Sequence, residues 1–165
     1  MDKKKILDNS QIKKKIRRIS LQIIESNIDE NEIIIAGIEN NGYIIAENIS
    51  NEIKNISKKN ITLCNISINK KNPRNEIIIS LDTEKYQNKS VIVVDDVLNS
   101  GSTLMYAVKH ILDTKVKKLK TAVLVDRNHK KYPIKADFKG LSLSTSIQNH
   151  VEVLINKNEI NAYLV

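Results

Sequence analysis

One stretch, residues 91–104, constrains the fold of this chain more than any other. Its sequence is Val-Ile-Val-Val-Asp-Asp-Val-Leu-Asn-Ser-Gly-Ser-Thr-Leu. The four β-branched residues at its start predict a short strand buried on both faces, and two adjacent carboxylates, Asp95 and Asp96, follow at the carboxyl end of that strand. The chain should therefore form an α/β fold in which this strand carries two acids to one edge of a parallel sheet.

The residues after the acids predict a turn that opens a helix. An amphipathic run from 104 to 112 follows, with Ser102 or Thr103 expected near its N-cap. Backbone N–H groups of such a turn and the positive end of the helix dipole face one point, where a phosphate can bind. The neighbouring carboxylates would repel that phosphate and suit ribose hydroxyls or a Mg²⁺ ion instead.

Two other interpretations compete for the acidic pair. Response regulators also carry adjacent acids after an apolar strand, but close to the N-terminus, whereas here the pair lies past the middle of the chain. In the second, Asp95 only caps the strand and Asp96 only solvates a loop. The hydroxyl-rich turn that follows favours a ligand site over both.

Length and composition narrow the class of protein. A chain of 165 residues suits a single domain spanning 1–165. The lone Cys64 excludes an internal disulfide and a cysteine-based metal site, and it is expected to be buried. Neither a signal peptide nor an apolar run near the length of a membrane span is present, which favours a cytoplasmic protein without membrane contact.

The net charge of +8 is concentrated near the start of the chain. Residues 1–18 hold eight Lys or Arg and two Asp, a local excess of +6. This excess is what a nucleic-acid surface would show, and it is also what lysine-rich surface filler would show. Because aromatic residues are nearly absent from this segment, base stacking there is disfavoured.

Strand and helix patterns alternate along the rest of the chain. Apolar residues at helical spacing predict a helix over 11–27, and a second strand–turn–helix unit follows over 32–53. Turns that follow parallel strands open on the same edge of a sheet, so both turns should meet at one site. Further expected segments are a strand at 61–69, an exposed basic loop at 70–75, a return strand at 77–79, a buried strand at 121–125, a loop-rich region at 133–140, a polar stretch at 142–146 and a strand at 151–154.

Two motifs together resemble a known family. The segment at 91–104 is similar to the phosphoribosyl pyrophosphate (PRPP) signature of type I phosphoribosyltransferases, in which apolar residues, two acids and a Thr/Ser-Gly-x-Thr loop follow one another. Residues 122–140, Ala-Val-Leu-Val-Asp-Arg-Asn-His-Lys-Lys-Tyr-Pro-Ile-Lys-Ala-Asp-Phe-Lys-Gly, resemble the matching segment of the PyrR family, pyrimidine-operon attenuators that are also uracil phosphoribosyltransferases. The likeness, which runs with gaps from about 12 to 153, implies a parallel sheet flanked by helices, a small base-side hood and a homodimer.

The resemblance also implies roles for the central motif. Asp95 and Asp96 would be the catalytic and metal-binding pair, holding the ribose hydroxyls and a Mg²⁺ cofactor. The turn would bind the 5′-phosphate of PRPP, and its only glycine would allow close approach of the backbone. The PRPP-binding residues are then Val97, Leu98, Asn99, Ser100, Gly101, Ser102 and Thr103.

Two further segments depart from the family pattern. The pyrophosphate loop of the family usually has Arg or Lys before its glycine, but here the turn is Glu39-Asn40-Asn41-Gly42, so a cation is missing. The basic loop matches the position of the family's mobile loop but lacks the Arg-Asp-Asp element of PyrR relatives. Lys70, Lys71 or Arg74 would have to reach the pyrophosphate in its place; the alternative is a solvated hairpin turn.

The second motif is expected to lie beside the nucleobase. The resemblance places Asp126, Arg127 and His129 on this base side, with Asp126 as a third catalytic candidate that exchanges a proton with the base. The alternative for Asp126 is an ion pair with Arg127 or a contact with a helix end.

Two functions follow from the resemblance. The first is a pentosyltransferase of nucleotide metabolism that joins a nucleobase, with uracil favoured and so pyrimidine salvage, to PRPP, giving a nucleoside 5′-monophosphate and pyrophosphate. The second is a nucleotide-sensing, RNA-binding transcription attenuator with little catalysis. Lys130 and Lys135 match basic positions of the RNA face of PyrR, but Leu141, Leu21 and Arg17 depart from it. A pocket that binds PRPP with neither activity is a third interpretation.

Overall fold

The computed structural model describes residues 3–144 and 149–165. Its largest element is a six-stranded sheet whose centre is formed by the strand that carries the acidic pair. All neighbouring strands are parallel except at one edge, where β4 runs antiparallel to β3. The strands, in their order across the sheet, are β4 (Ile78–Ile79), β3 (Asn60–Ser67), β2 (Glu32–Ile38), β5 (Ser90–Leu98), β6 (Lys118–Asp126) and β7 (Phe138–Ser142).

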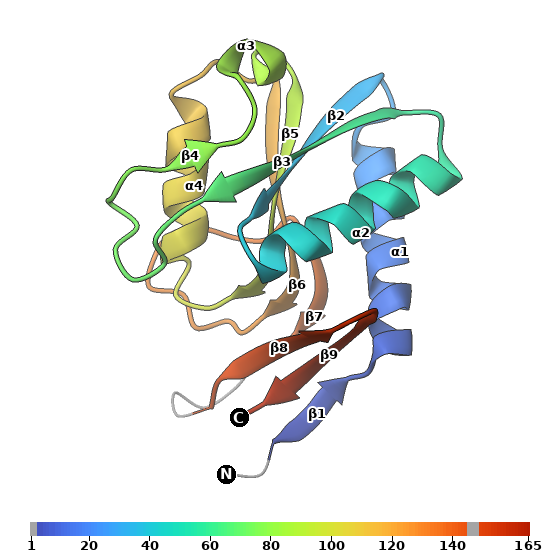
Figure 1. Ribbon diagram of the computed structural model, residues 1–165, viewed down its shortest axis with the longest axis vertical. Helices are drawn as coiled ribbons and strands as arrows, with labels where there is room; N and C mark the ends of the chain where they lie inside the picture. Colours follow the sequence, from blue (N-terminus) through green and yellow to red (C-terminus); the bar gives the residue numbers. More distant parts are fainter. Residues whose placement is uncertain (1–2, 145–148) are drawn as a thin grey trace.

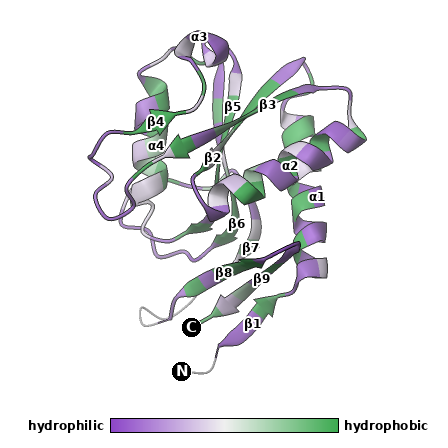
Figure 2. Ribbon diagram, viewed as in Figure 1, coloured by the Kyte–Doolittle hydropathy of each residue, from purple (hydrophilic) through white to green (hydrophobic). Residues whose placement is uncertain are grey.

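Helices cover both faces of this sheet, as the sequence predicted (Figure 1). α1 (Asn9–Ser26) and α2 (Asn41–Ile56) pack on one face, and α4 (Ser102–Leu112) with the short α3 (Thr83–Tyr86) packs on the other. Figure 2 shows α1 and α2 banded in apolar and polar residues, which is the pattern of helices that bury one side. The expected class, a parallel α/β sheet flanked by helices, is confirmed.

A second, three-stranded antiparallel sheet lies beyond the carboxyl ends of the central strands (Figure 1). It consists of β1 (Lys4–Leu7), β9 (Glu159–Leu164) and β8 (Val151–Asn156), with Lys4 opposite Leu164. Its apolar side chains join the core beneath α1 and α2. Only β8 was expected from the sequence. β9 directly follows β8 and pairs with it as a hairpin that closes at Asn156 and Glu159, whereas β1 is short and its partner lies at the other end of the chain.

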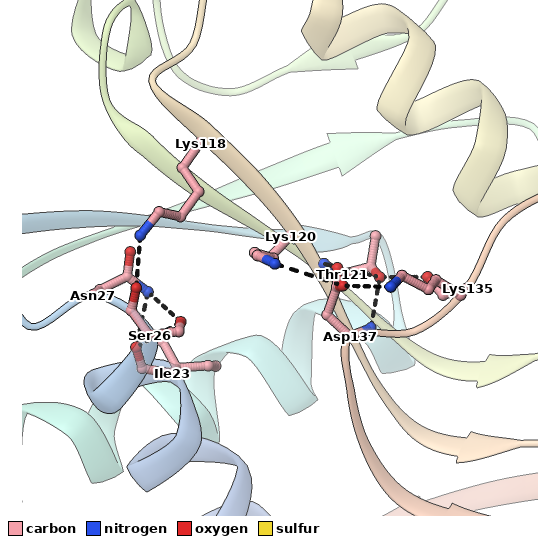
Figure 3. A network of polar contacts seen from close by, with 8 residues as sticks. All are labelled: Ile23, Ser26, Asn27, Lys118, Lys120, Thr121, Lys135 and Asp137. Carbon is pink, nitrogen blue, oxygen red and sulfur yellow. Dashed lines mark hydrogen bonds and ion pairs between the residues drawn. The ribbon is translucent and has the colours of Figure 1, made fainter.

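The expected loop over 133–140 is wrong in its last part, because Phe138–Ser142 forms strand β7. The partly buried carboxylate of Asp137 lies just before this strand: its Oδ2 accepts a hydrogen bond from Thr121 N at 2.9 Å and so fixes the chain beside β6 (Figure 3). Gly140 then permits close approach, since a Cβ there would lie 2.6 Å from Leu124 O. Two residues of the predicted polar stretch, 145 and 146, lie outside the described residues.

Lysine side chains hold the carboxyl end of α1. Lys118 Nζ donates to Ser26 O at 2.6 Å, and Asn27 Nδ2 donates to Ile23 O at 2.8 Å (Figure 3). Lys59 Nζ adds hydrogen bonds to Asn27 O at 2.8 Å and to two further carbonyls. Cations suit the negative end of a helix dipole. Lys59 and Lys118 therefore stabilise the end of this helix.

The strand order brings two helix-opening turns together. β3 lies on one side of β2, and β5, which follows later in the chain, lies on the other side of β2. The direction in which successive strands are added to the sheet therefore reverses between β2 and β5. Ligands of parallel α/β sheets bind outside the carboxyl ends of strands at such a point. Among the described residues, no helix is long and apolar enough to cross a membrane.

Candidate active site

The acidic pair lies at the carboxyl end of β5, facing the small sheet. Asp95 is buried and Asp96 is partly buried. Asp95 Oδ1 accepts a hydrogen bond from Asp96 N at 2.9 Å, and Asp96 Oδ1 accepts one from Val97 N at 2.8 Å. Backbone amides therefore orient both carboxylates without neutralising them.

Burial and the neighbouring Asp96 raise the pKa of Asp95 to about 7, and the ammonium of Lys70 partly opposes this rise. The same two carboxylates raise the pKa of Lys70, although its burial acts in the other direction. The pair thus holds its full negative charge only when a cation is close or the pH is above neutral.

This raised pKa predicts how stability depends on pH. The folded protein keeps a proton on Asp95 that an unfolded chain releases near pH 4, so raising the pH from about 4 to about 7 lowers the free energy of unfolding, by at most about 1.4 kcal/mol per pH unit. An Asp95→Asn variant, which mimics the protonated group, should unfold at nearly the same temperature as the unmodified protein at about pH 3.5, below the unfolded pKa, and at a higher temperature at about pH 7. A difference in melting temperature that stays constant over this range would contradict the raised pKa.

The turn after β5 places a glycine directly before α4. Gly101 is the N-cap of α4, with φ at 86°, and Ser102 is the first helical residue, so the two hydroxyl residues lie next to the N-cap as expected. A Cβ on Gly101 would lie 2.4 Å from Ile134 Cγ2. The turn therefore needs glycine both for its positive φ and for space.

A cavity of about 350 Å³ lies between this turn, the acidic pair and the small sheet. It brings together the acidic pair and all seven residues of the predicted PRPP loop, and it adds a wall from β8 that sequence patterns did not predict. Its lining residues are Asn41, Lys70, Val123, residues 95–104 and residues 151–153.

The turn between β2 and α2 reaches the cavity through Asn41. Asn41 Nδ2 donates to Asp96 Oδ2 at 3.0 Å and to Val153 O at 2.9 Å, so it joins one carboxylate to β8. Asn40, the N-cap of α2, has φ 67° and ψ −123°, which lies outside the left-handed helical region that asparagine tolerates, so the backbone of this turn is strained. The sequence marked Asn41 only as a missing cation, whereas the structure gives it a tethering role.

The other two residues of this turn face elsewhere. Glu39 points toward β3, where its carboxylate accepts Ser67 Oγ at 2.7 Å and Ile68 N at 3.2 Å. Gly42 lies against the acidic strand, since a Cβ there would lie 2.9 Å from Asp95 Oδ1 and 3.1 Å from Val94 O. The turn thus packs directly on the carboxylates.

The basic loop after β3 sends one of its three predicted cations into the cavity. Lys70 Nζ lies 3.3 Å from Asp95 Oδ1 and 3.8 Å from Asp96 Oδ1. Lys71 is exposed, and Arg74 lines a separate cavity beside Tyr106 and α4. In this conformation the acidic pair and the basic loop meet through Lys70 alone.

The base-side candidates lie at the carboxyl end of β6. The carboxylate of Asp126 is fully buried, and its Oδ2 lies 3.3 Å from Lys139 Nζ and 3.7 Å from Lys130 Nζ. Lys139 was not among the predicted site residues, because it approaches Asp126 only through the β6–β7 pairing. The two lysine contacts hold the Asp126 carboxylate in place at this end of the strand.

Arg127 and His129 lie next to the turn on its other side. The Arg127 guanidinium donates to Asn99 Oδ1 at 2.9 Å and to Asn149 O, and its burial lowers the pKa of the side chain. His129 lines a second cavity of about 590 Å³, together with Arg127, Lys130 and Lys131. This second cavity shares Asn99 with the first, so the two are adjacent.

The residues present fit a magnesium ion. Within 3–144 and 149–165, no group of three or more His, Cys, Asp and Glu side chains is placed to hold a metal by itself. Mg²⁺ is commonly held by one or two carboxylates and completed by phosphate oxygens of a ligand. Asp95 and Asp96 supply that number of carboxylates beside a turn suited to phosphate.

The sequence matches a known protein family and several of its curated members. Residues 2–156 match the Phosphoribosyl transferase domain family. The chain is 35% identical over 162 residues to the Bifunctional protein PyrR of Streptococcus thermophilus, covering 95% of this chain and 92% of that protein. It is 34% identical to the Bifunctional protein PyrR of Clostridium botulinum, covering 94% and 91% of the two chains.

Solved structures share the architecture at lower identity. A hypoxanthine-guanine phosphoribosyltransferase from Bacillus anthracis aligns with a TM-score of 0.78 and 22% identity, covering 99% of both chains. The hypoxanthine phosphoribosyltransferase of Trypanosoma cruzi aligns with a TM-score of 0.76 and 15% identity, covering 96% of this chain and 95% of that one. At these identities the likeness supports the fold alone.

Proposed function

Because this chain belongs to the type I phosphoribosyltransferase family and resembles its PyrR members, we propose that it transfers the phosphoribosyl group of Mg-PRPP to a nucleobase. The products are a nucleoside 5′-monophosphate and pyrophosphate. The observation that carries this proposal is the single cavity shared by Asp95, Asp96 and the turn around Gly101. Carboxylates and an amide-rich turn, one beside the other, suit the two ends of a sugar phosphate.

Each part of the cavity has a separate task in this proposal. Asp95 and Asp96 bind the ribose hydroxyls and the Mg²⁺, which when bound draws charge from the departing pyrophosphate. The amides and hydroxyls of residues 99–103 bind the 5′-phosphate. The wall from β8 excludes water from the reacting sugar carbon, where positive charge develops. Positioning and electrostatics then supply the catalysis, and no side chain needs to form a covalent bond.

Uracil is the proposed base, and the support for it is the resemblance of residues 122–140 to PyrR proteins. The base would enter beside Arg127 and His129, which adjoin the turn. Asp126, which is fully buried and paired with two lysines, would then orient this region without touching the base. A cytoplasmic homodimer is the assembly that the resemblance implies.

Pyrophosphate release tests the proposal. With Mg²⁺ and PRPP present, we expect release with one base of a panel containing uracil, hypoxanthine, guanine, adenine, xanthine and orotate, and uracil should be that base. An equal mixture without Mg²⁺ serves as the control and should release none. Silence across the whole panel, with PRPP still binding by calorimetry, would contradict the transferase and favour a sensor.

A PyrR-type RNA-binding regulator is the second candidate, and the basic second cavity favours it. Apart from the Asp126 carboxylate behind Lys130, the described residues lining this cavity are cationic or uncharged. An RNA-binding surface that extends from this cavity onto α1 is disfavoured, because the guanidinium of Arg17 is already paired with Glu52 at 2.7 Å. An RNA-binding regulator requires affinity for RNA that falls steeply as salt is raised, because phosphate contacts release counterions.

A further inference from the structure

The proposed PRPP cavity is poor in positive charge. Among the described residues that line it, Lys70 is the one cationic side chain, whereas Asp95, Asp96 and Glu152 are acidic. PRPP would add several negative charges to this cavity. Any such ligand therefore depends on Lys70 and on a metal ion for electrostatic balance.

The ammonium of Lys70 is paired with the two carboxylates. It lies 3.3 Å from Asp95 Oδ1 and 3.8 Å from Asp96 Oδ1, and so it bridges the two acids. A divalent cation bound by the same pair would compete for these oxygens. Binding of the metal to these oxygens therefore weakens the ion pairs of the Lys70 ammonium with Asp95 and Asp96, and the reverse also holds.

The turn between β2 and α2 offers no substitute cation. Asn41 is already bonded to Asp96 and to β8, and Glu39 is bonded to the start of the basic loop. The positive charge that would pair with the pyrophosphate must therefore come from a residue outside this turn. Lys70 is the one cation within the cavity that can supply it.

We propose that Lys70 is an exchangeable counter-ion: Mg²⁺ displaces its ammonium from Asp95 and Asp96, and the released ammonium then pairs with the diphosphate of PRPP. This inference rests on the proposed function and assigns Lys70 a positioning role in it. Lys70 therefore becomes available to the diphosphate only after Mg²⁺ has bound to the two carboxylates.

The loop permits such an exchange without refolding. Glu39 fixes the backbone at Ile68, and Asn69 Oδ1 accepts hydrogen bonds from Lys71 N at 3.0 Å and Asn72 N at 3.1 Å. The backbone on both sides of Lys70 is thus held locally. Rotation of the Lys70 side chain is sufficient to move its charge across the cavity.

Two titrations on one variant test the exchange. Lys70→Met keeps the apolar stem and removes the charge, and Lys115→Met is the matched control from an exposed position outside the cavity. Mn²⁺, titrated alone and followed by electron paramagnetic resonance, should bind Lys70→Met about tenfold more tightly, because no ammonium has to be displaced. PRPP, titrated with Mg²⁺ by calorimetry, should bind the same variant about tenfold more weakly.

The opposite signs of the two changes are the signature of the exchange. Lys115→Met should change neither affinity, and thermal unfolding should show that both variants fold. Unchanged or weakened Mn²⁺ binding to Lys70→Met would overturn the proposal, as would unchanged PRPP binding. An unmodified protein that binds Mn²⁺ but not PRPP would contradict the proposed function instead, and the Mn²⁺ comparison would still decide whether metal and ammonium compete.

Discussion

Replacing Asp96 by asparagine is expected to weaken the binding of Mg-PRPP by about 100-fold while leaving the fold intact. The carboxylate of Asp96 is one of two acids available to the metal, and an amide at this position removes the charge without changing the size of the side chain. The asparagine Oδ1 can still accept the hydrogen bond from Val97 N that orients the native side chain, whereas its Nδ2 cannot accept the hydrogen bond that Asn41 Nδ2 donates to the native Oδ2. Calorimetric titration with PRPP and Mg²⁺ measures the loss.

Asp82→Asn is the matched control for this variant. Asp82 is exposed and forms only a surface ion pair with Lys85, so its change should leave both PRPP affinity and stability nearly unaltered. Unchanged PRPP affinity in Asp96→Asn, with normal thermal unfolding, would show that the ligand binds elsewhere. It would also remove the basis for the metal assignment.

Replacing Gly42 by alanine should damage both stability and binding. Alanine is favoured over glycine within a helix by roughly 1 kcal/mol. The added Cβ, however, would lie 3.1 Å from both Val94 O and Asp95 Cα, which are backbone atoms that cannot rotate away. Such overpacking costs about 1–3 kcal/mol, so we expect a net loss of about 1 kcal/mol in the free energy of unfolding and a displaced Asp95.

Denaturant unfolding and PRPP titration together check this result. Asn51→Ala, an exposed change on the same helix, is the control and should retain full affinity. The Gly42→Ala variant should lose about tenfold in PRPP affinity, corresponding to about 1.4 kcal/mol. Greater stability with native affinity would mean that α2 does not press on the acidic strand.

The central features of the fold and site were predictable because their signals are local. The β-branched run before Asp95, the acids and the glycine turn are consecutive in the sequence, so a short window predicts a strand, a charged tip and a helix start. The parallel arrangement then brings the turn at 39–42 to the same edge. Local pattern and strand order together predicted where a site would form.

The rest depends on partners far apart in the chain. Strand β7 forms because Asp137 contacts Thr121, and Lys139 reaches Asp126 only as a result of that pairing. No short window contains both members of either pair. Which of Lys70, Lys71 and Arg74 reaches the acidic pair likewise depends on the path of the loop backbone. The presence of three positive charges in the sequence does not reveal that path.

The antiparallel pairing of β1 with β9 has a consequence for synthesis of the protein. Residues near 5 must wait for residues near 160 before their strand can form, which gives the small sheet some of the longest-range contacts in the molecule. Contacts of this kind form late because closing a long loop is entropically costly. Residues 151–153 of β8 form one wall of the cavity. During synthesis on the ribosome, the turn at residues 97–103 can therefore fold well before the cavity is closed.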